Sequence, residues 1–220
     1  RISVELPGVK EPERVKKLLA SSAMLEFWAV GEGNDAAAVA SVLAGDNNLQ
    51  GKLRINENCI APFHVGVADY EYVDVITEYL ADPVVKAKLP YGVKLAWEQK
   101  SVDGKTYGDF RLVVLKGTAP LMDGSGITNA SAQSSDKNGG MVVSLSMNGE
   151  AADEWANVTA NNVGKAIAIV MDGVVYSAPN VNEPITGGQS QITGQFTQED
   201  TKDLANVLKS GKMPAPAKIV

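Results

Sequence analysis

The chain has very little of what most catalytic and metal sites are built from. Its 220 residues include a single cysteine, Cys59, and a single histidine, His64. One cysteine cannot form an intramolecular disulfide, and a zinc site built from cysteine and histidine is largely excluded. No apolar run approaches the ~18 residues that a membrane-spanning helix needs. The chain starts at Arg1, directly with a strand-like pattern, so we expect it to be a soluble piece of a longer protein.

The chain also lacks an excess of positive charge. It carries 20 Lys and Arg residues against 26 Asp and Glu residues, for a net charge of −6. Proteins that bind nucleic acid or anionic membrane surfaces usually carry a basic stripe or cluster. The composition therefore argues against both classes of partner. Hydrophobic residues make up 45% of the chain, which is ordinary for a globular protein with a buried core.

No motif of nucleotide binding or serine hydrolysis is present, because the sequence contains no GxGxxG, P-loop or GxSxG pattern. His64 lies on an apolar strand-like run without an evident partner and is interpreted as an ordinary surface or interface histidine, not as a general base. Cys59 has no basic cluster nearby and is predicted to be a small buried residue. The acidic pairs at 153–154 and 199–200 fall in the first turns of predicted helices, where the helix dipole favours negative charge. We predict no catalytic residue, no metal and no cofactor.

The clearest pattern lies in residues 165–194. Six consecutive apolar residues, 166–171, are typical of a strand buried on both faces. Asp172-Gly173 follows, the dipeptide that best tolerates the positive φ angles of a type I′ turn, and a β-rich run resumes directly after it. A buried hairpin is therefore predicted. An irregular segment rich in proline and asparagine, residues 178–188, comes next, and we call it the lip. Its prolines predict an ordered backbone.

The two ends of the chain carry matching patterns. Alternation at 2–6 predicts a strand, an apolar stripe at 15–19 predicts a helix, and 23–30 reads as a second strand. Near the other end, Thr197 caps a predicted helix that Gly211 is placed to end, and 217–220 is predicted to form a closing strand. Because neither end has a sheet partner of its own, we predict that they fold together. Phe27 and Leu204 should then share one core.

Shorter patterns fill the rest of the chain. Residues 116–140, rich in Gly, Ser, Asn and Asp, are predicted to form a surface loop. The other predicted elements are a helix at 35–43, strands near 52–60 and 63–67, helices capped by Asp69 and by Asp82-Pro83, a β-hairpin of 93–97 with 110–114, a strand at 141–147 and a helix at 151–159.

These elements predict an α+β fold in three regions. A split ferredoxin-like base is formed by residues 1–30 and 196–220, an α/β region is inserted at 31–117, and a separate α+β head subdomain spans 118–195. The boundaries of the head place candidate hinges at Gly117, Thr118, Gly194 and Gln195.

Apolar residues in and beside the lip are the binding surface that the sequence suggests. Tyr176, Val181 and Ile185 lie beside two prolines in irregular backbone, where such side chains can bind many unrelated apolar chains. A place in the core would explain them equally well. Gly187-Gly188 and the asparagines of the lip leave open a small-ligand site. The acidic pairs leave open, less favourably, an atypical carboxylate hydrolase.

Three long segments resemble the SecD family of the Sec protein-export machinery. They are ISVELPGVKEPERVKKLLASSAMLEF at the start, residues 165–194, and FTQEDTKDLANVLKSGKMPAPAKIV at the end. Residues 29–139 correspond only loosely and look like an enlarged insertion. The resemblance implies that the chain is most of the family's large first periplasmic domain, on the outer side of the bacterial inner membrane, and that it is not an enzyme.

The resemblance also implies a function and partners. In the SecD family this domain captures preprotein that emerges from the translocon. Movement of the head relative to the base, driven by proton flow through the membrane part, then pulls the preprotein outward. The implied partners are unfolded preprotein, SecF, YajC and the SecYEG channel. The chain lacks the membrane helices that hold the family's proton-carrying acidic residue, so we expect it to bind but not to pump.

Overall fold

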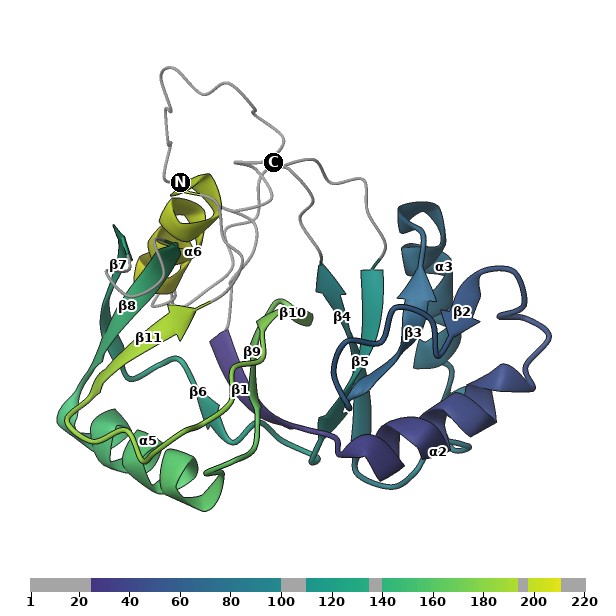
Figure 1. Ribbon diagram of the computed structural model, residues 1–220, viewed down its shortest axis with the longest axis horizontal. Helices are drawn as coiled ribbons and strands as arrows, with labels where there is room; N and C mark the ends of the chain where they lie inside the picture. The colour runs from purple at the N-terminus through teal and green to yellow at the C-terminus, as the bar shows by residue number, and fades with distance from the viewer. Residues whose placement is uncertain (1–24, 100–109, 135–139, 194–197, 211–220) are drawn as a thin grey trace, which may run out of the picture.

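Two β-sheets of unequal size organise the computed structural model, which describes residues 25–99, 110–134, 140–193 and 198–210 (Figure 1). The larger sheet has eight strands in the order β2-β3-β5-β4-β10-β9-β1-β6, and the smaller sheet has three in the order β11-β8-β7. The α+β class predicted from the sequence is confirmed. The strands are β1 (Leu25–Val30), β2 (Leu53–Ile55), β3 (His64–Ala68), β4 (Val93–Gln99), β5 (Phe110–Lys116), β6 (Met122–Asp123), β7 (Ile127–Ser134), β8 (Met141–Met147), β9 (Ile167–Met171), β10 (Val174–Ser177) and β11 (Gln189–Thr193).

The helices flank the two sheets. In Figure 1, α5 and α6 lie on the side of the smaller sheet, whereas α2 and α3 lie on the side of β2 to β5. The bounds of the helices are α2 (Gly33–Ala44), α3 (Tyr70–Ala81), α4 (Pro83–Lys86), α5 (Gly149–Asn161) and α6 (Gln198–Ser210).

Local capping explains where these helices begin. The Asp82 carboxylate accepts a hydrogen bond from the N–H of Val84 at 2.7 Å, and Pro83 occupies the first turn, so the predicted start is confirmed. Asn148 caps α5 in the same way, through the N–H of Ala151 at 2.9 Å. Asp69 precedes α3 as predicted, but its side chain makes no capping bond.

Five strands of the larger sheet close into a ring. β1 pairs with β9, β9 with β10, β10 with β4, β4 with β5, and β5 with β1 again through Ala29↔Lys116 and Val30↔Leu115. All five strands contribute alternate residues to one apolar cluster, which we place inside the ring. Several of its members are alanines, as expected where a narrow interior cannot take a large side chain from every strand. The cluster consists of Trp28, Phe63, Ala96, Val113, Leu115, Ala166, Ala168, Val170 and Val175.

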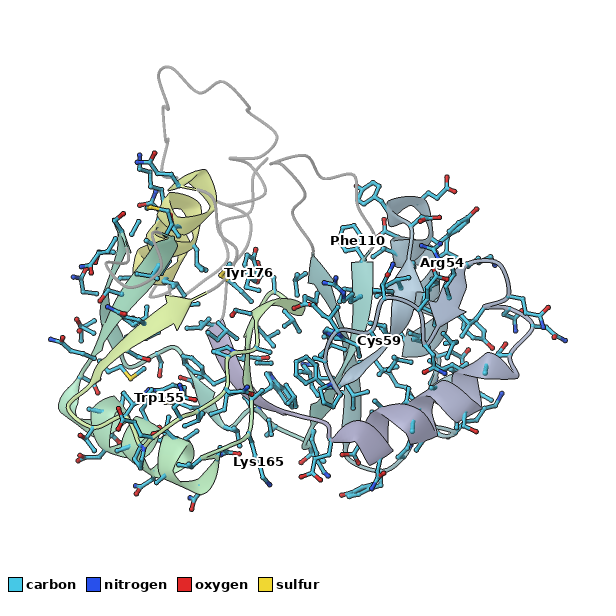
Figure 2. All side chains as sticks on the ribbon, in the orientation of Figure 1. Arg54, Cys59, Phe110, Trp155, Lys165 and Tyr176 are labelled. Carbon is cyan, nitrogen blue, oxygen red and sulfur yellow. The ribbon has the colours of Figure 1, made fainter. Side chains whose placement is uncertain are left out.

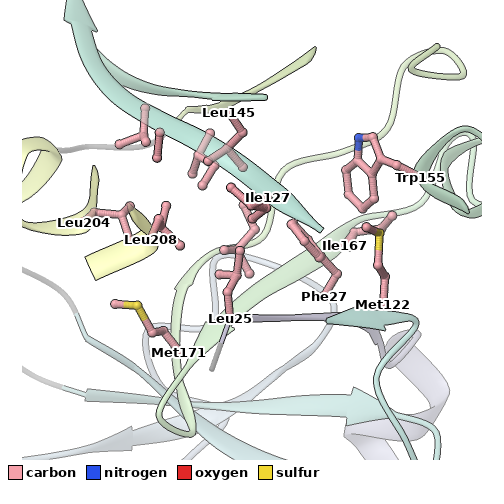
Figure 3. Packing of buried hydrophobic residues seen from close by; sticks show 14 of the residues in the cluster. Leu25, Phe27, Met122, Ile127, Leu145, Trp155, Ile167, Met171, Leu204 and Leu208 are labelled. Carbon is pink, nitrogen blue, oxygen red and sulfur yellow. The ribbon is translucent and has the colours of Figure 1, made fainter. Parts of the chain in front are cut away.

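A second apolar cluster lies between the smaller sheet and the outer face of the ring. Residues of β1 and β9 that point away from the ring meet the smaller sheet there, with α5 at one end and α6 at the other (Figure 3). Phe27 and Leu204 both belong to this cluster, so the prediction that they share one core is confirmed. The largest members are Leu25, Phe27, Met122, Ile127, Leu145, Trp155, Ile167, Ile169, Met171, Ile192, Leu204 and Leu208.

A third cluster packs α2, α3 and α4 against β2 to β5. Ile76, Leu80 and Val85 come from the predicted apolar faces of α3 and α4, whereas Val39 and Leu43 come from α2, and all five are buried. The cluster forms the core of the part of the chain that was predicted as an insertion.

The central hairpin has the predicted turn. Asp172 and Gly173 have φ angles of 50° and 79°, so both central residues lie in the left-handed region that a type I′ turn requires. β9 is buried at every position because one face lines the ring and the other contacts the second cluster. This two-sided burial is the physical reason for its unbroken apolar run.

The loop predicted at 116–140 is wrong over much of its length. β6 and the eight-residue β7 lie within it, and Ile127 and Ala130 are buried in the second cluster. Pairing of β7 with β8 shifts register between Ile127 and Asn129. This bulge interrupts the alternation of apolar and polar residues, so a search for a period of two residues does not detect the strand.

Strands of all three predicted regions take part in the larger sheet. β1 belongs to the predicted base, β2 to β5 to the insertion, and β6, β9 and β10 to the head. The predicted strands at 2–6 and 217–220 and the helix boundaries at Thr197 and Gly211 lie outside the described residues. The boundaries of base, insertion and head therefore stay a prediction.

Candidate functional site

A groove opens where the smaller sheet diverges from the outer face of β1 and β9, beside the lip. It encloses about 490 Å³. Its walls combine the lip, β11, part of β8 and α5. The lining residues are Phe27, Ser144, Leu145, Trp155, Ile167, Ile169, Pro179, Asn180, Val181, Asn182, Glu183, Ile185, Gln189, Ser190, Gln191 and Ile192.

The floor of the groove is apolar. Phe27 of β1 and Trp155 of α5 lie with their ring centroids 4.5 Å apart and their planes tilted by 46°. Ile167 and Ile169 reach the same floor, because alternate residues of β9 point away from the ring. The indole N–H of Trp155 is buried without a hydrogen-bond partner in the part of the chain that the structure describes. A buried indole N–H usually has such a partner.

The rim of the groove is polar but almost uncharged. Asn180 and Asn182 stand on the lip side and Gln189 and Gln191 on the side of β11, and all four are exposed. Glu183 is the one ionisable residue in the lining. Such a rim offers hydrogen-bond donors and acceptors without selecting for charge.

Backbone hydrogen bonds hold the lip in place. Val181 donates its N–H to Lys165 O at 2.9 Å and accepts the N–H of Gly164 at 2.8 Å. Ile185 donates its N–H to Thr159 Oγ1 at 2.9 Å, which ties the lip to α5. The groove is therefore formed by fixed backbone, as the prolines of the lip led us to expect.

The structure brings two of the three predicted binding residues into the groove. Ile185 is half-buried and packs against the second cluster, whereas Val181 is only 7% exposed and belongs to that cluster. Tyr176 lies in the strand β10, so the prediction that it sits in irregular backbone is wrong. Its side chain is 40% exposed and does not line the groove. Figure 2 shows Tyr176 and Trp155 well apart. The sequence did not suggest that Phe27 and Trp155 line a binding groove, because they come together only when α5 packs against β1.

Gly188 has a packing role that needs no ligand. A Cβ atom at this position would lie 2.8 Å from the Cβ of Ala152 and 3.3 Å from Met147 O. Glycine therefore lets the end of the lip pack closely against α5 and β8. This close approach accounts for the glycine at that position without a small-ligand site.

The predicted hinge at Gly117 and Thr118 lies at the exit of β5. Gly117 has a φ angle of 117° and donates its N–H to Gly92 O at 2.7 Å. Lys116, just before it, makes an ion pair of 2.9 Å with Asp35, and the hydrogen bond from Lys116 holds the pKa of Asp35 below its usual range. The other two candidate hinge residues, Gly194 and Gln195, lie outside the described residues.

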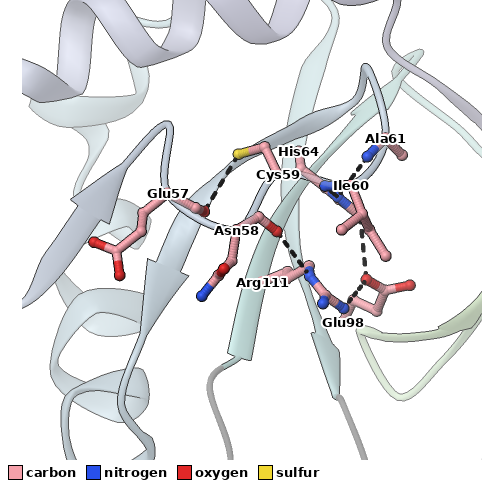
Figure 4. A network of polar contacts seen from close by, with 8 residues as sticks. All are labelled: Glu57, Asn58, Cys59, Ile60, Ala61, His64, Glu98 and Arg111. Atoms are coloured by element: carbon pink, nitrogen blue, oxygen red, sulfur yellow. Dashed lines mark hydrogen bonds and ion pairs between the residues drawn. The ribbon is translucent and has the colours of Figure 1, made fainter.

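His64 is buried at the centre of a polar network (Figure 4), so the interpretation of His64 as a surface residue is wrong. Its Nδ1 accepts the backbone N–H groups of Ile60 at 3.2 Å and Ala61 at 3.1 Å, so the ring hydrogen lies on Nε2. That Nε2 is 3.1 Å from Glu98 Oε2, an electrostatic contact without good hydrogen-bond alignment. The histidine thus holds the loop at 56–62 against β4.

Arg111 completes this network from β5. Its Nη1 lies 3.5 Å from Glu98 Oε2, and its Nε donates to Asn58 O at 3.1 Å. Burial alone would raise the pKa of Glu98, but the contact with His64 and the charge of Arg111 outweigh it, so the pKa lies below its usual value of 4.5. Sequence reasoning missed both residues. A signal existed, because Glu98 and Arg111 lie in phase with the buried Ala96 and Val113.

The prediction that Cys59 is buried is wrong, since its side chain is exposed. Asn56 and Asn58 adopt left-handed backbone, with φ angles of 59° and 49°, and the loop turns outward between them. Partial desolvation still raises the pKa of the Cys59 thiol, and the charge of Arg111 opposes that rise.

Among the described residues, no three His, Cys, Asp or Glu side chains are grouped closely enough to hold a metal ion. No described helix is both long and apolar enough to cross a membrane.

Comparison with protein families gives two matches. The model described as the P1 head subdomain of SecDF matches residues 99–215. The model described as the N-terminal part of the P1 domain of protein translocase subunit SecDF matches residues 1–32.

Several curated relatives align with the whole chain, among them two SecD subunits. Protein translocase subunit SecD of Rhodothermus marinus is 34% identical, and that of Syntrophobacter fumaroxidans is 32% identical. The chain spans 41% and 33% of their respective lengths, so it corresponds to less than half of each relative.

Two solved structures of SecDF share the fold. The first, described as a membrane component that enhances protein export, is 28% identical with a TM-score of 0.51, over 99% of this chain and 78% of that one. The second, a crystal structure of SecDF in a super-membrane-facing form, is 26% identical with a TM-score of 0.50, over 96% of this chain and 22% of that one.

Proposed function

The chain belongs to the SecD and SecDF family of protein translocase subunits, and from this membership we propose that it binds preprotein emerging from the translocon. The domain would lie on the periplasmic side of the bacterial inner membrane. The membrane part of the parent subunit would use the proton gradient to help pull the bound chain across.

The observation that carries this proposal is the groove between β11 and the lip. Its apolar floor, made by Phe27, Trp155, Ile167 and Ile169, can take apolar side chains that are exposed only in an unfolded chain. Its rim of asparagine and glutamine can bind main-chain groups of any sequence. Such a surface fits a protein that must accept many different preproteins.

Affinity for any one segment should be modest. A groove of about 490 Å³ covers only a few residues of an extended chain. A subunit that moves its substrate must also release it. We therefore expect Kd values near or above about 1 μM, equivalent to about −8 kcal/mol or weaker.

We further propose that the groove belongs to a head that moves relative to a split ferredoxin-like base. The head would span residues 118–195, between Gly117-Thr118 and Gly194-Gln195. Two contacts support the first of these boundaries: the ion pair of Lys116 with Asp35 and the hydrogen bond from Gly117 to Gly92 O anchor the chain directly before it. Residues 1–30 and 196–220 would form the base, and residues 31–117 the insertion.

The partners proposed for the parent subunit are SecF, YajC and the SecYEG channel. The relatives' description as protein translocase subunits supports association with a translocon. We propose neither enzymatic activity nor a cofactor for the domain.

Site-specific photocrosslinking in the full-length parent subunit tests the proposal. A photoreactive residue in place of Ile185, in the groove, should crosslink to a stalled export intermediate in membranes. The same residue in place of Tyr91, which is 97% exposed and lies in the turn before β4, serves as the matched control. Crosslinks at Ile185 with few at Tyr91 would support capture in the groove. Equal crosslinking at both positions, or none at Ile185, would contradict it.

A further inference from the structure

β11 is an edge strand that borders the groove. It pairs with β8 on one side, from Gln189↔Ser146 to Thr193↔Val142, without a register shift. Among the described residues, no strand pairs with its other side. Both β11 and residues of β9 line the groove, so the free edge of β11 faces into it.

The backbone groups on this free edge can be assigned. Met147 donates its N–H to Gly188 O at 2.8 Å, and the antiparallel register places these two residues opposite each other. Residues that bond to β8 alternate with residues whose N–H and C=O point away from it. Ser190 and Ile192 therefore bond to β8, and the backbone groups of Gln189 and Gln191 point to the free edge.

The edge carries none of the usual devices against strand addition. Natural edge strands are commonly protected by lysine, by proline or by a bulge. The sequence of β11, Gln-Ser-Gln-Ile-Thr, has no charge and no proline, and its pairing with β8 is regular. A five-residue edge of this kind can template another extended chain.

The floor of the groove lies where an added strand would direct its side chains. In an extended chain, successive side chains point to opposite faces while the main chain bonds sideways. A chain beside β11 would direct every second side chain to the floor at Phe27, Trp155 and Ile169. Its other side chains would face outward, past the exposed amides of the rim.

We propose that the groove binds an extended polypeptide segment as an additional strand on the free edge of β11. Main-chain hydrogen bonds to Gln189 and Gln191 would supply affinity that does not depend on sequence, and the floor would favour apolar residues at alternate positions. This inference rests on the proposed function, since the segment would be part of a translocating preprotein. It adds the mode of recognition: the protein binds mainly the backbone of the substrate and selects only weakly among its side chains.

A pair of substitutions at one position tests this mode. Gln191→Pro removes the N–H that points to the free edge, and an edge strand tolerates proline where the N–H is not used in the sheet. Gln191→Ala removes the same side chain but keeps the N–H. Binding of a fluorescein-labelled eight-residue peptide of alternating Val and Thr to the full chain would be followed by anisotropy. Gln191→Pro should raise Kd about 3- to 10-fold relative to Gln191→Ala, as expected for one lost hydrogen bond.

A second arm leaves the protein unchanged. The same peptide would be N-methylated at every second residue, in the two possible phases. One phase removes the N–H groups that face β11 and should abolish binding, whereas the other should bind nearly as well as the parent peptide. Equal binding of both phases would overturn strand addition, as would equal Kd values for the Gln191→Pro and Gln191→Ala variants.

Failure of this mode can be told from failure of the proposed function. If crosslinks form at Ile185 but N-methylation in either phase has no effect, capture in the groove stands and strand addition is overturned. If neither the peptide nor a stalled preprotein contacts the groove, both proposals fall.

Discussion

Phe27 on β1 and Leu204 on α6 pack into the same buried cluster, although they stand near opposite ends of the chain. Phe27 is 1% exposed and Leu204 is 2% exposed. Phe27 also contacts Trp155 of α5 in the groove. The helix α6, which carries Leu204, therefore supports the core on which the groove is built.

Leu204→Ala should therefore destabilise the whole domain. Removing a buried leucine side chain costs about 2–5 kcal/mol of unfolding free energy. Denaturant unfolding measures this loss, and hydrogen exchange should show reduced protection of the β1 amides. Asn206→Ala, at an exposed position of the same helix, should change the unfolding free energy by less than about 0.5 kcal/mol. Unaltered protection of β1 in Leu204→Ala would show that α6 folds independently of it.

Gly173→Val should destabilise the chain by more than about 1 kcal/mol, because β-branched residues strongly disfavour positive φ. Gly173 has a φ angle of 79° and no atom within 4 Å of an added Cβ, so conformational strain is the relevant cost. Gly173→Asn is the matched control, since asparagine tolerates left-handed backbone. If Gly173→Asn lowered the melting temperature as much as Gly173→Val, the loss of stability would have a cause other than the positive φ angle.

His64→Asn and His64→Leu should separate the bonding role of His64 from its volume. The Asn Oδ1 atom can stand where Nδ1 accepts the N–H groups of Ile60 and Ala61. Leucine fills the space but leaves both amides unpaired, at a cost of about 1–3 kcal/mol for each that stays buried. We expect hydrogen exchange at Ile60 and Ala61 to stay slow in the Asn variant and to become fast in the Leu variant. Slow exchange in both would mean that the loop does not depend on the histidine.

Glu98 should make the stability of the fold depend on acidic pH. Its pKa is lowered in the folded state from the usual 4.5, so its stabilising contribution is present above that pH. The contribution is lost as the pH falls through the lower, folded-state pKa. Glu98→Gln should flatten this part of the curve of unfolding free energy against pH. Glu78→Gln, at an exposed position of α3, is the control and should keep the slope of the parent chain.

The hairpins and helices of the chain could be predicted because their patterns are local. The alternation in β4 and β5 and the turn residues Asp172 and Gly173 each act within a few positions. β7 was missed because its bulge at Ile127 and Asn129 breaks that local period.

The ring and the groove could not be predicted in the same way. The ring depends on the parallel contact of β10 with β4 and on the contact of β5 with β1, and no local pattern specifies either pairing. The groove combines Phe27, Trp155 and the lip, which come from three distant parts of the chain. Proline and asparagine at 178–188 indicated an ordered lip, but not which side chains would face inward.

The three residues first singled out for preprotein binding should respond differently to serine. Val181→Ser should destabilise the fold. Val181 is buried in the second cluster, so the serine hydroxyl would lie among apolar atoms. Tyr176→Ser should leave both folding and capture nearly unchanged, since Tyr176 is exposed and does not line the groove.

Ile185→Ser should weaken capture of a preprotein while the domain stays folded. Ile185 is only partly buried and lies in the groove, and its N–H keeps the bond to Thr159 Oγ1 whatever the side chain. In the full-length parent subunit, we expect fewer crosslinks from a stalled preprotein to the groove, a lower rate of export, and a melting temperature close to that of the unchanged domain. The same loss in Tyr176→Ser, with Ile185→Ser unaffected, would move the path of the substrate from the groove to the exposed face of β10.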